Sequence, residues 1–204
     1  MKRILRTVIC AVLVGLSACS STTFESTWKS PDAQPVNPQN KSVAALVISS
    51  DKKRRRDAEI YLAHELTVRG ARGVAAYTLI GIDLPNVDVA RERFKEAGVD
   101  GVVIMRLVAH DSQTIVDPGG FSGSAYTTFG SYYQSYGMSL TYSTGSVQTD
   151  EWLTIETLIY SLNQDKLLWA GTSRTTNPEG LQGLITEVAN AVSRQVAKQG
   201  VVAR

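Results

Sequence analysis

Val43-Ala44-Ala45-Leu46-Val47-Ile48 is an unbroken apolar run, the pattern of a strand buried on both faces. Ser49-Ser50-Asp51 follows it and predicts a helix start, because short polar side chains cap helix N-termini. Apolar residues then recur at helical spacing as far as Leu66, and Gly70 predicts the helix end. This strand–helix unit predicts an α/β domain.

The alternation of strands and helices continues along the chain. A β-α-β-α-β order predicts right-handed crossovers and helices packed on a sheet. Asn163-Gln164-Asp165 separates two alternating segments and predicts a hairpin, and Asn177-Pro178 predicts the start of a C-terminal helix. We expect one α/β domain, with a mixed sheet and helices mainly on one face. The expected strands are 43–48, 74–80, 101–109, 152–162 and 167–175, and the expected helices are 51–69, 87–97 and from 178 onward.

The N-terminal segment has the pattern of a secretory signal peptide. Three cations precede an apolar run over residues 7–16, which is shorter than the about 20 residues of a membrane span. The run closes on Leu16-Ser17-Ala18-Cys19, which resembles the lipobox of bacterial lipoproteins. By that resemblance the chain is cut before Cys19, and Cys19 receives lipid on its sulfur and on its new amino end. Cleavage by the general signal peptidase and retention of the segment are the alternatives.

Cleavage before Cys19 changes the bulk properties of the chain. It removes three of the 21 lysines and arginines and none of the 19 acidic residues, so the formal side-chain charge moves from +2 to −1. A near-neutral charge gives no indication of a nucleic-acid partner. Cys10 is lost with residues 1–18, and Cys19 becomes a thioether. No thiol then remains for a disulfide, a metal site or a nucleophile.

Residues 19–41 are rich in Ser, Thr, Pro, Asn and Gln, and they predict a lipidated tether that precedes the domain at 42–204. Phe24 and Trp28 interrupt this composition, which indicates that they dock on the domain or lie at the lipid surface. Ser20, in place of Asp, resembles the sorting signal for the outer membrane. We expect a location on the periplasmic face of that membrane, with the bilayer bound through acylated Cys19.

The sequence motifs predict no catalytic residue, cofactor or metal site. His64-Glu65 lacks the second histidine of a zinc-protease helix, because Val68 occupies that position. Gly120-Phe121-Ser122-Gly123-Ser124 is near the nucleophile-elbow pattern, but it ends in Ser and lies in a loop. We therefore expect a protein that is not an enzyme.

Five consecutive cations, Lys52-Lys53-Arg54-Arg55-Arg56, open the first helix, where the helix dipole favours anions. They are either a solvated helix start, offset by neighbouring acids such as Asp51, or an anion-binding patch. In the cell envelope such a patch would bind phospholipid head groups, lipopolysaccharide phosphates or an acidic partner. It would also strengthen the attachment of a lipid-anchored protein.

A second polar group is expected on the sheet. The hairpin register makes Glu156 and Arg174 diagonal neighbours on one face, and Arg106 joins them if its strand lies beside the hairpin. The group is either an ordinary ion pair on a solvated face or the polar floor of a binding site.

Residues 117–146 form a long insertion rich in Gly, Ser and Tyr. This composition is typical of adaptable binding loops, in which Tyr supplies contact area. The alternative is an insertion without a partner. The candidate partner-binding residues are Tyr126, Tyr132, Tyr133, Tyr136 and Tyr142.

Two segments resemble a group of uncharacterised Gram-negative envelope lipoproteins. One is Phe24 to Pro31, behind the lipobox. The other is Lys166 to Pro178, with the sequence Lys-Leu-Leu-Trp-Ala-Gly-Thr-Ser-Arg-Thr-Thr-Asn-Pro. The element order is also similar to that of small periplasmic accessory domains, including the N-terminal domain of the Tol-system periplasmic protein. The resemblance implies a non-catalytic accessory or binding lipoprotein of envelope assembly or maintenance, with an envelope protein or glycan as partner. A peptidoglycan- or glycan-binding module and a periplasmic enzyme are the alternatives.

Overall fold

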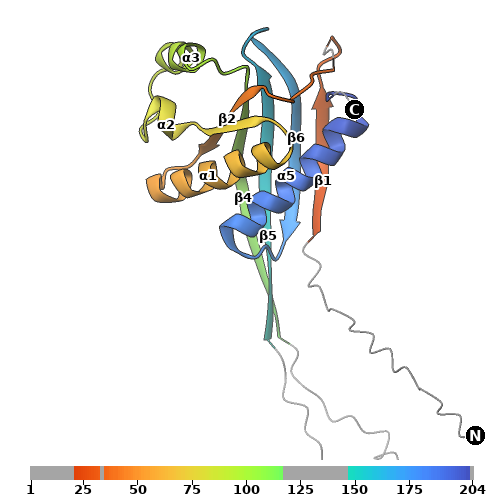
Figure 1. Cartoon of the computed structure of the whole chain (residues 1–204). Coiled ribbons are helices and arrows are strands. Elements are labelled where there is room, and N and C mark those ends of the chain that lie inside the picture. The colour runs from red at the N-terminus through yellow and green to blue at the C-terminus, as the bar shows by residue number, and fades with distance from the viewer. Residues whose placement is uncertain (1–20, 33–34, 117–146, 203–204) are drawn as a thin grey trace, which may run out of the picture.

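The computed structural model describes residues 21–32, 35–116 and 147–202. They form a six-stranded mixed sheet in the order β1-β6-β5-β4-β2-β3, with helices packed against it (Figure 1). The expected α/β class, mixed sheet and C-terminal helix are confirmed. The elements are β1 (Ser21–Lys29), β2 (Ser42–Ile48), α1 (Lys52–Val68), β3 (Arg72–Ala75), α2 (Tyr77–Ile80), α3 (Val87–Glu96), β4 (Gly101–Val116), β5 (Val147–Ser161), β6 (Lys166–Thr176) and α5 (Gly180–Lys198).

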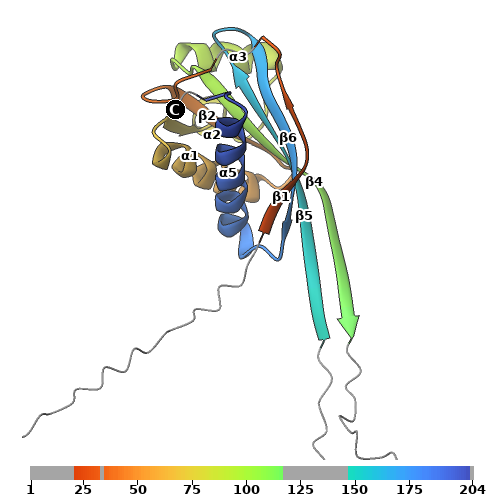
Figure 2. The same ribbon diagram turned by 90° about the vertical axis from the view of Figure 1, so that its right-hand side faces the viewer.

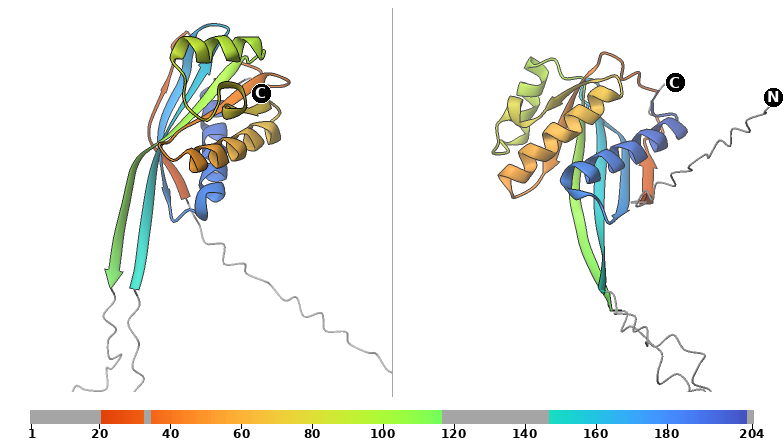
Figure 3. Two further views of the ribbon diagram at one scale, coloured as in Figure 1. Left: turned by 90° about the vertical axis from the view of Figure 1, so that its left-hand side faces the viewer. Right: turned by 60° about the horizontal axis from the view of Figure 1, so that its bottom comes forward.

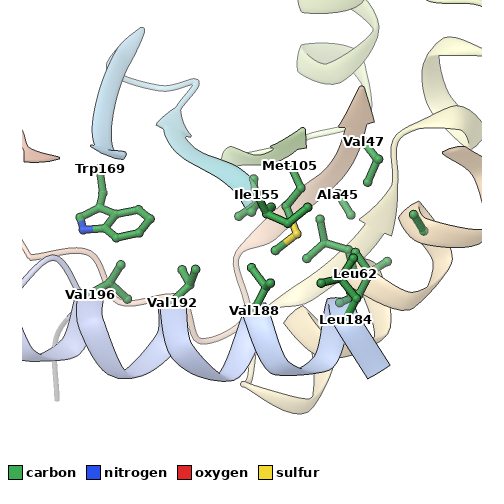
Figure 4. Packing of buried hydrophobic residues seen from close by; sticks show 14 of the residues in the cluster. Ala45, Val47, Leu62, Met105, Ile155, Trp169, Leu184, Val188, Val192 and Val196 are labelled. Atoms are coloured by element: carbon green, nitrogen blue, oxygen red, sulfur yellow. The ribbon is translucent and has the colours of Figure 1, made fainter. Parts of the chain in front are cut away.

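Helices α1 and α5 cover one face of the sheet, as Figure 2 shows from the side. The apolar stripe of α5 includes Leu184, Val188 and Val192, and it points at the sheet (Figure 4). Met105 of β4 and Ile155 of β5 belong to the same buried cluster. The main core therefore lies between α5, α1 and the four central strands.

Strand β2 is buried on both faces, as its unbroken apolar run predicts. Ala45 and Val47 belong to the main core under α1 and α5. Ala44 and Leu46 belong to a second cluster, which includes Phe94 of α3. This second cluster occupies only the β2 end of the sheet, so no other described residues cover the same face of β1, β6 and β5, which we call the open face.

The expected strand at 74–80 is wrong beyond residue 75, because β3 ends at Ala75 and the chain turns into α2. The Tyr77 amide donates to the Glu59 carboxylate over 2.6 Å, and the Thr78 hydroxyl donates to the Ala75 carbonyl over 2.7 Å. These bonds draw the chain away from the sheet after four paired residues. Gly81, at φ +83°, then ends the turn of helix.

The expected tether over residues 19–41 is wrong for Ser21–Lys29, because this segment is edge strand β1, antiparallel to β6. The Phe24 ring packs edge-on against the buried Trp169 indole, with 5.7 Å between centroids. This confirms that Phe24 docks on the domain, whereas Trp28 remains 47% exposed. Gly171 makes room for the indole, since a Cβ there would overlap it.

Strands β4 and β5 are longer than expected and project beyond the other strands (Figures 1 and 3). We call residues 112–116 and 147–151 the arm, because within the sheet they pair only with each other. The register shifts between Leu107 and Ala109, and such a bulge bends a strand. Figure 2 shows the hairpin leaving the sheet and bending away from α5.

Helix α5 begins at Gly180, two residues later than the expected first position at Pro178. Asn177 has a left-handed backbone, with φ +48°, and does not cap the helix. Its side-chain carbonyl instead accepts from the Glu151 amide over 2.8 Å. Asn177 therefore ties the start of α5 to the base of the arm.

Candidate ligand-binding pocket

A pocket of about 360 Å³ opens between the start of α5, the start of α1 and the end of β2. Its walls include Leu184 and Val188, which point from α5 toward Met105 and Ile155 in Figure 4. The apolar wall residues are Val47, Ile48, Ala58, Met105, Leu107, Leu153, Ile155, Pro178, Leu181, Leu184, Ile185 and Val188. This lining matches the mostly apolar walls of small-molecule sites.

The pocket exists because the β4–β5 hairpin bends away from α5 after the bulge. Leu153 and Leu181 are only partly buried although both pack on the main core. Leu107 is 47% exposed at the bend. The first turn of α5 therefore has less sheet to cover than the later turns, and apolar side chains line the gap.

The polar residues of the pocket come from three different elements. Arg54 belongs to α1 and Arg106 to β4, and His110 of β4 contacts Glu151 of β5 at the base of the arm, with 2.6 Å from Nε2 to Oε1. Arg106 also lines the pocket, but its guanidinium pairs with Glu156 over 2.9 Å on the other, open face of the sheet. The pocket thus combines apolar walls with charged groups.

The structure divides the five cations of residues 52–56. Lys52 pairs with Asp83 over 2.6 Å, and both Lys53 and Arg56 lie against Asp57. The hydrogen bond between Lys53 and Asp57 raises the pKa of Lys53 and lowers the pKa of Asp57. Arg54 is exposed, and no ion pair within the described part of the chain involves its guanidinium.

Arg55 has to be removed from the candidate anion-binding patch. Its side chain is 2% exposed, and Nε donates to the fully buried Glu59 carboxylate over 2.8 Å. The guanidinium also donates to the Ile82 carbonyl. Glu59 in turn accepts the amides of Val47 and Tyr77. This pair joins α1 to β2 and α2, so Arg55 is a structural residue.

The expected sheet-face cluster divides into two separate pairs. Arg106 joins Glu156, as the adjacency of β4 and β5 requires. Arg174 pairs with Glu25 of β1 instead, over 2.9 Å. Both pairs lie on the open face, where their side chains are about one-third to one-half exposed. The predicted register of the hairpin is confirmed, with Glu156 opposite Thr172 and Arg174 opposite Thr154.

The remaining candidate residues are His64, Cys19 and the five tyrosines of the loop. His64 is exposed on α1, as its position on the helix predicts. Cys19 and the five loop tyrosines, Tyr126, Tyr132, Tyr133, Tyr136 and Tyr142, lie outside the described residues. The last described pair before the loop is Val116 with Val147, so the loop leaves from the tip of the arm.

Residues 21–32, 35–116 and 147–202 contain no cluster of three or more His, Cys, Asp or Glu side chains suited to a metal ion. Within the same ranges, no helix is both long and apolar enough to cross a membrane.

Neither a protein-family model nor a curated protein matches this chain. Among solved structures, a PelC dodecamer from Paraburkholderia phytofirmans is similar at 13% identity and TM-score 0.48, and a PelC variant dodecamer from the same organism at 11% and 0.46. Each alignment covers 91% of this chain and 99% of the other. Lipoprotein GNA1162 from Neisseria meningitidis is similar at 15% identity and TM-score 0.41, over 78% of this chain and 99% of that one. Similarities at these scores carry no functional argument.

Proposed function

We propose that this protein is a non-catalytic envelope lipoprotein, attached to the inner leaflet of the outer membrane through Cys19, that acts by binding. One observation carries the proposal: the start of β1, the pocket and the arm lie at the same end of the sheet. Ser21 pairs with Thr176, and Thr176 pairs with Trp152 at the base of the arm. Pro178, two residues after Thr176, lines the pocket.

The early start of β1 supports this orientation. Only Ser20 separates Cys19 from strand β1, and two residues span at most about 7 Å when extended. A lipid on Cys19 would therefore hold this end of the sheet, with the pocket and the base of the arm, close to the bilayer. The lipid would then be attached almost directly to strand β1, Ser21–Lys29, and not through a long tether.

The pocket supports binding as the mode of action. Its walls are mainly aliphatic side chains, and its polar groups stand at the edge in ion pairs or in solvent. The loop at the tip of the arm would supply a second contact, through its tyrosines, with an envelope protein. The cations of residues 52–56 other than Arg55 would favour anionic surfaces.

The attachment is tested by replacing Cys19 with Ser in the full chain, with Cys10→Ser as the matched control. Membrane fractions and metabolic labelling with palmitate report the outcome. We expect Cys19→Ser to lose the label and the membrane association, while Cys10→Ser retains both. A Ser20→Asp variant should move the protein from the outer to the inner membrane. Labelling that survives in Cys19→Ser would overturn the anchor.

The role of the loop is tested by deleting residues 117–146 and recovering partners after in-cell crosslinking. We expect the deletion to abolish recovery of one envelope protein, and a photoreactive residue at Tyr133 should crosslink to it in the intact chain. Unchanged recovery would remove the loop from the proposal. Co-sedimentation with purified cell wall would favour the glycan-binding alternative.

A further inference from the structure

Among the described residues, the charges around the pocket leave one cation without an ion-pair partner. Glu156 neutralises Arg106, and Glu151 contacts His110. Arg54, which also lines the pocket, has no acidic partner among the described residues. An exposed guanidinium beside an apolar cavity can hydrogen-bond a carboxylate or phosphate in a fork geometry. The pocket therefore has apolar walls and one group, the Arg54 guanidinium, that can bind an anion.

The size of the pocket limits what it can hold. A volume of about 360 Å³ lies at the lower end of the range for small-molecule sites. This space suits one alkyl chain and is too small for a complete two-chain phospholipid. The walls supply the apolar contact that such a chain needs, from Leu181 and Leu184 on one side to Leu153 and Ile155 on the other.

We infer that the pocket binds a single acyl chain whose anionic head group, a carboxylate or a phosphate, pairs with Arg54. The inference deepens the proposed function and rests on it for the source of the ligand, since the anchored end of the sheet would face a leaflet that supplies acyl chains. An uncharged apolar peptide would fill the walls and leave Arg54 without a role. An acyl anion uses both features.

The experiment uses the full chain, reconstituted in nanodiscs of phosphatidylcholine, and a palmitic acid that carries a photoreactive diazirine in its chain. After illumination the protein is digested, and the labelled peptides are identified by mass spectrometry. We expect labelling of the peptides that contain Leu153 to Ile155 and Leu181 to Val188. Mapping by peptide separates the pocket from label that reaches the lipid-attached N-terminus.

Arg54 and Arg56 provide a matched pair of variants. Both are exposed cations on the first turns of α1, but only Arg54 lines the pocket. We expect Arg54→Glu to reduce pocket labelling about fivefold or more, the effect of losing one charge pair, and Arg56→Glu to leave it unchanged. Leu181→Glu, which places a carboxylate in the wall, should abolish the labelling while circular dichroism shows an intact fold.

Competition identifies the head group. Palmitate competes if a free fatty acid is the ligand, and a lysophospholipid with a phosphoglycerol head competes more strongly if the ligand is a phosphate amphiphile. Hexadecanol, which has no charge, should compete poorly. Equal competition by hexadecanol, equal labelling of Arg54→Glu and Arg56→Glu, or label confined to peptides outside the pocket would overturn the inference. None of these results bears on the Cys19 fractionation, so the two proposals fail separately.

Discussion

Two regions of this protein contain arginine–glutamate pairs of nearly equal length and very different surroundings. Between α1 and β2, Arg55 and Glu59 lie 2.8 Å apart and are almost completely buried. On the open face of the sheet, Arg106 and Glu156 lie 2.9 Å apart and are largely solvated. The distances are alike, so the energetic difference comes from the water that each pair has lost. The buried pair is also hydrogen-bonded to backbone on two further elements, whereas the exposed pair only links neighbouring strands.

The largest effect is expected when the buried pair is broken. Arg55→Ala leaves the Glu59 carboxylate buried without its cation, which we expect to lower the free energy of unfolding by about 3–5 kcal/mol. Arg54→Ala, one residue away and exposed, should change it by less than about 0.5 kcal/mol. Urea denaturation followed by circular dichroism measures both. Equal effects would show that Arg55 is solvated in solution.

Gly171 and Thr172 are neighbouring uncharged residues of β6 on opposite faces of the sheet, so substitutions there compare the helix-covered face with the open face. Gly171→Ala forces a methyl group against the Trp169 indole, and we expect a loss of about 1–3 kcal/mol in the free energy of unfolding. Thr172→Ala, which changes the next residue along the strand, should lose less than about 1 kcal/mol. The Trp169 fluorescence spectrum should shift only in Gly171→Ala. A neutral Gly171→Ala would mean that the indole repacks freely.

A pair of intermediate burial should give a pH-dependent contribution. Desolvation opposes ionisation of Glu65, but hydrogen bonds from Arg69 and Thr186 outweigh it and lower the pKa of Glu65 from its ordinary 4.5. Because the pKa is lower in the folded state, ionised Glu65 stabilises the fold above about pH 4.5 and loses this effect as the pH falls through the lowered pKa. The melting temperature of Glu65→Gln should therefore depend less on pH below 4.5 than that of the wild type. Glu92→Gln on α3 serves as the control and should follow the wild type.

The smallest effect is expected on the open face. Arg106→Ala removes a solvated pair and should cost less than about 1 kcal/mol, and Arg174→Ala should behave alike. Raising the salt concentration should reduce both effects further. A loss as large as that of Arg55→Ala would indicate that another molecule covers this face in solution.

The buried position of Arg55 and the location of the core can both be predicted from the sequence. Arg55 shares a helix face with Ala58 and Leu62 at i+3 and i+7, and Glu59 follows at i+4. This spacing predicts an inward-facing ion pair, which the simple view of a solvated charge run overlooks. Strand β2 and the stripe of α5 are also predictable, since β2 is an unbroken apolar run and the apolar residues of α5 recur at helical spacing.

The pocket and β1 could not be predicted in this way. The pocket depends on one register shift between Leu107 and Ala109, and the residue types at these positions do not predict a bulge. Strand β1 is formed mainly by Ser and Thr. It becomes a strand because it pairs with β6 and because Phe24 packs against Trp169. Both features arise from contacts between distant parts of the chain.

The pairing of β1 with β6 also fixes an order of events during folding. Phe24 meets Trp169 only after almost the whole chain has emerged, because the two residues belong to the first and last strands. Closing so long a loop is slow relative to local helix and hairpin formation. Under the lipid anchor that we propose, residues near Cys19 would therefore stay accessible to processing until β1 pairs with β6. Once β1 has docked, the chain from Ser21 onward belongs to the sheet, so the proposed processing at Cys19 would have to come before docking.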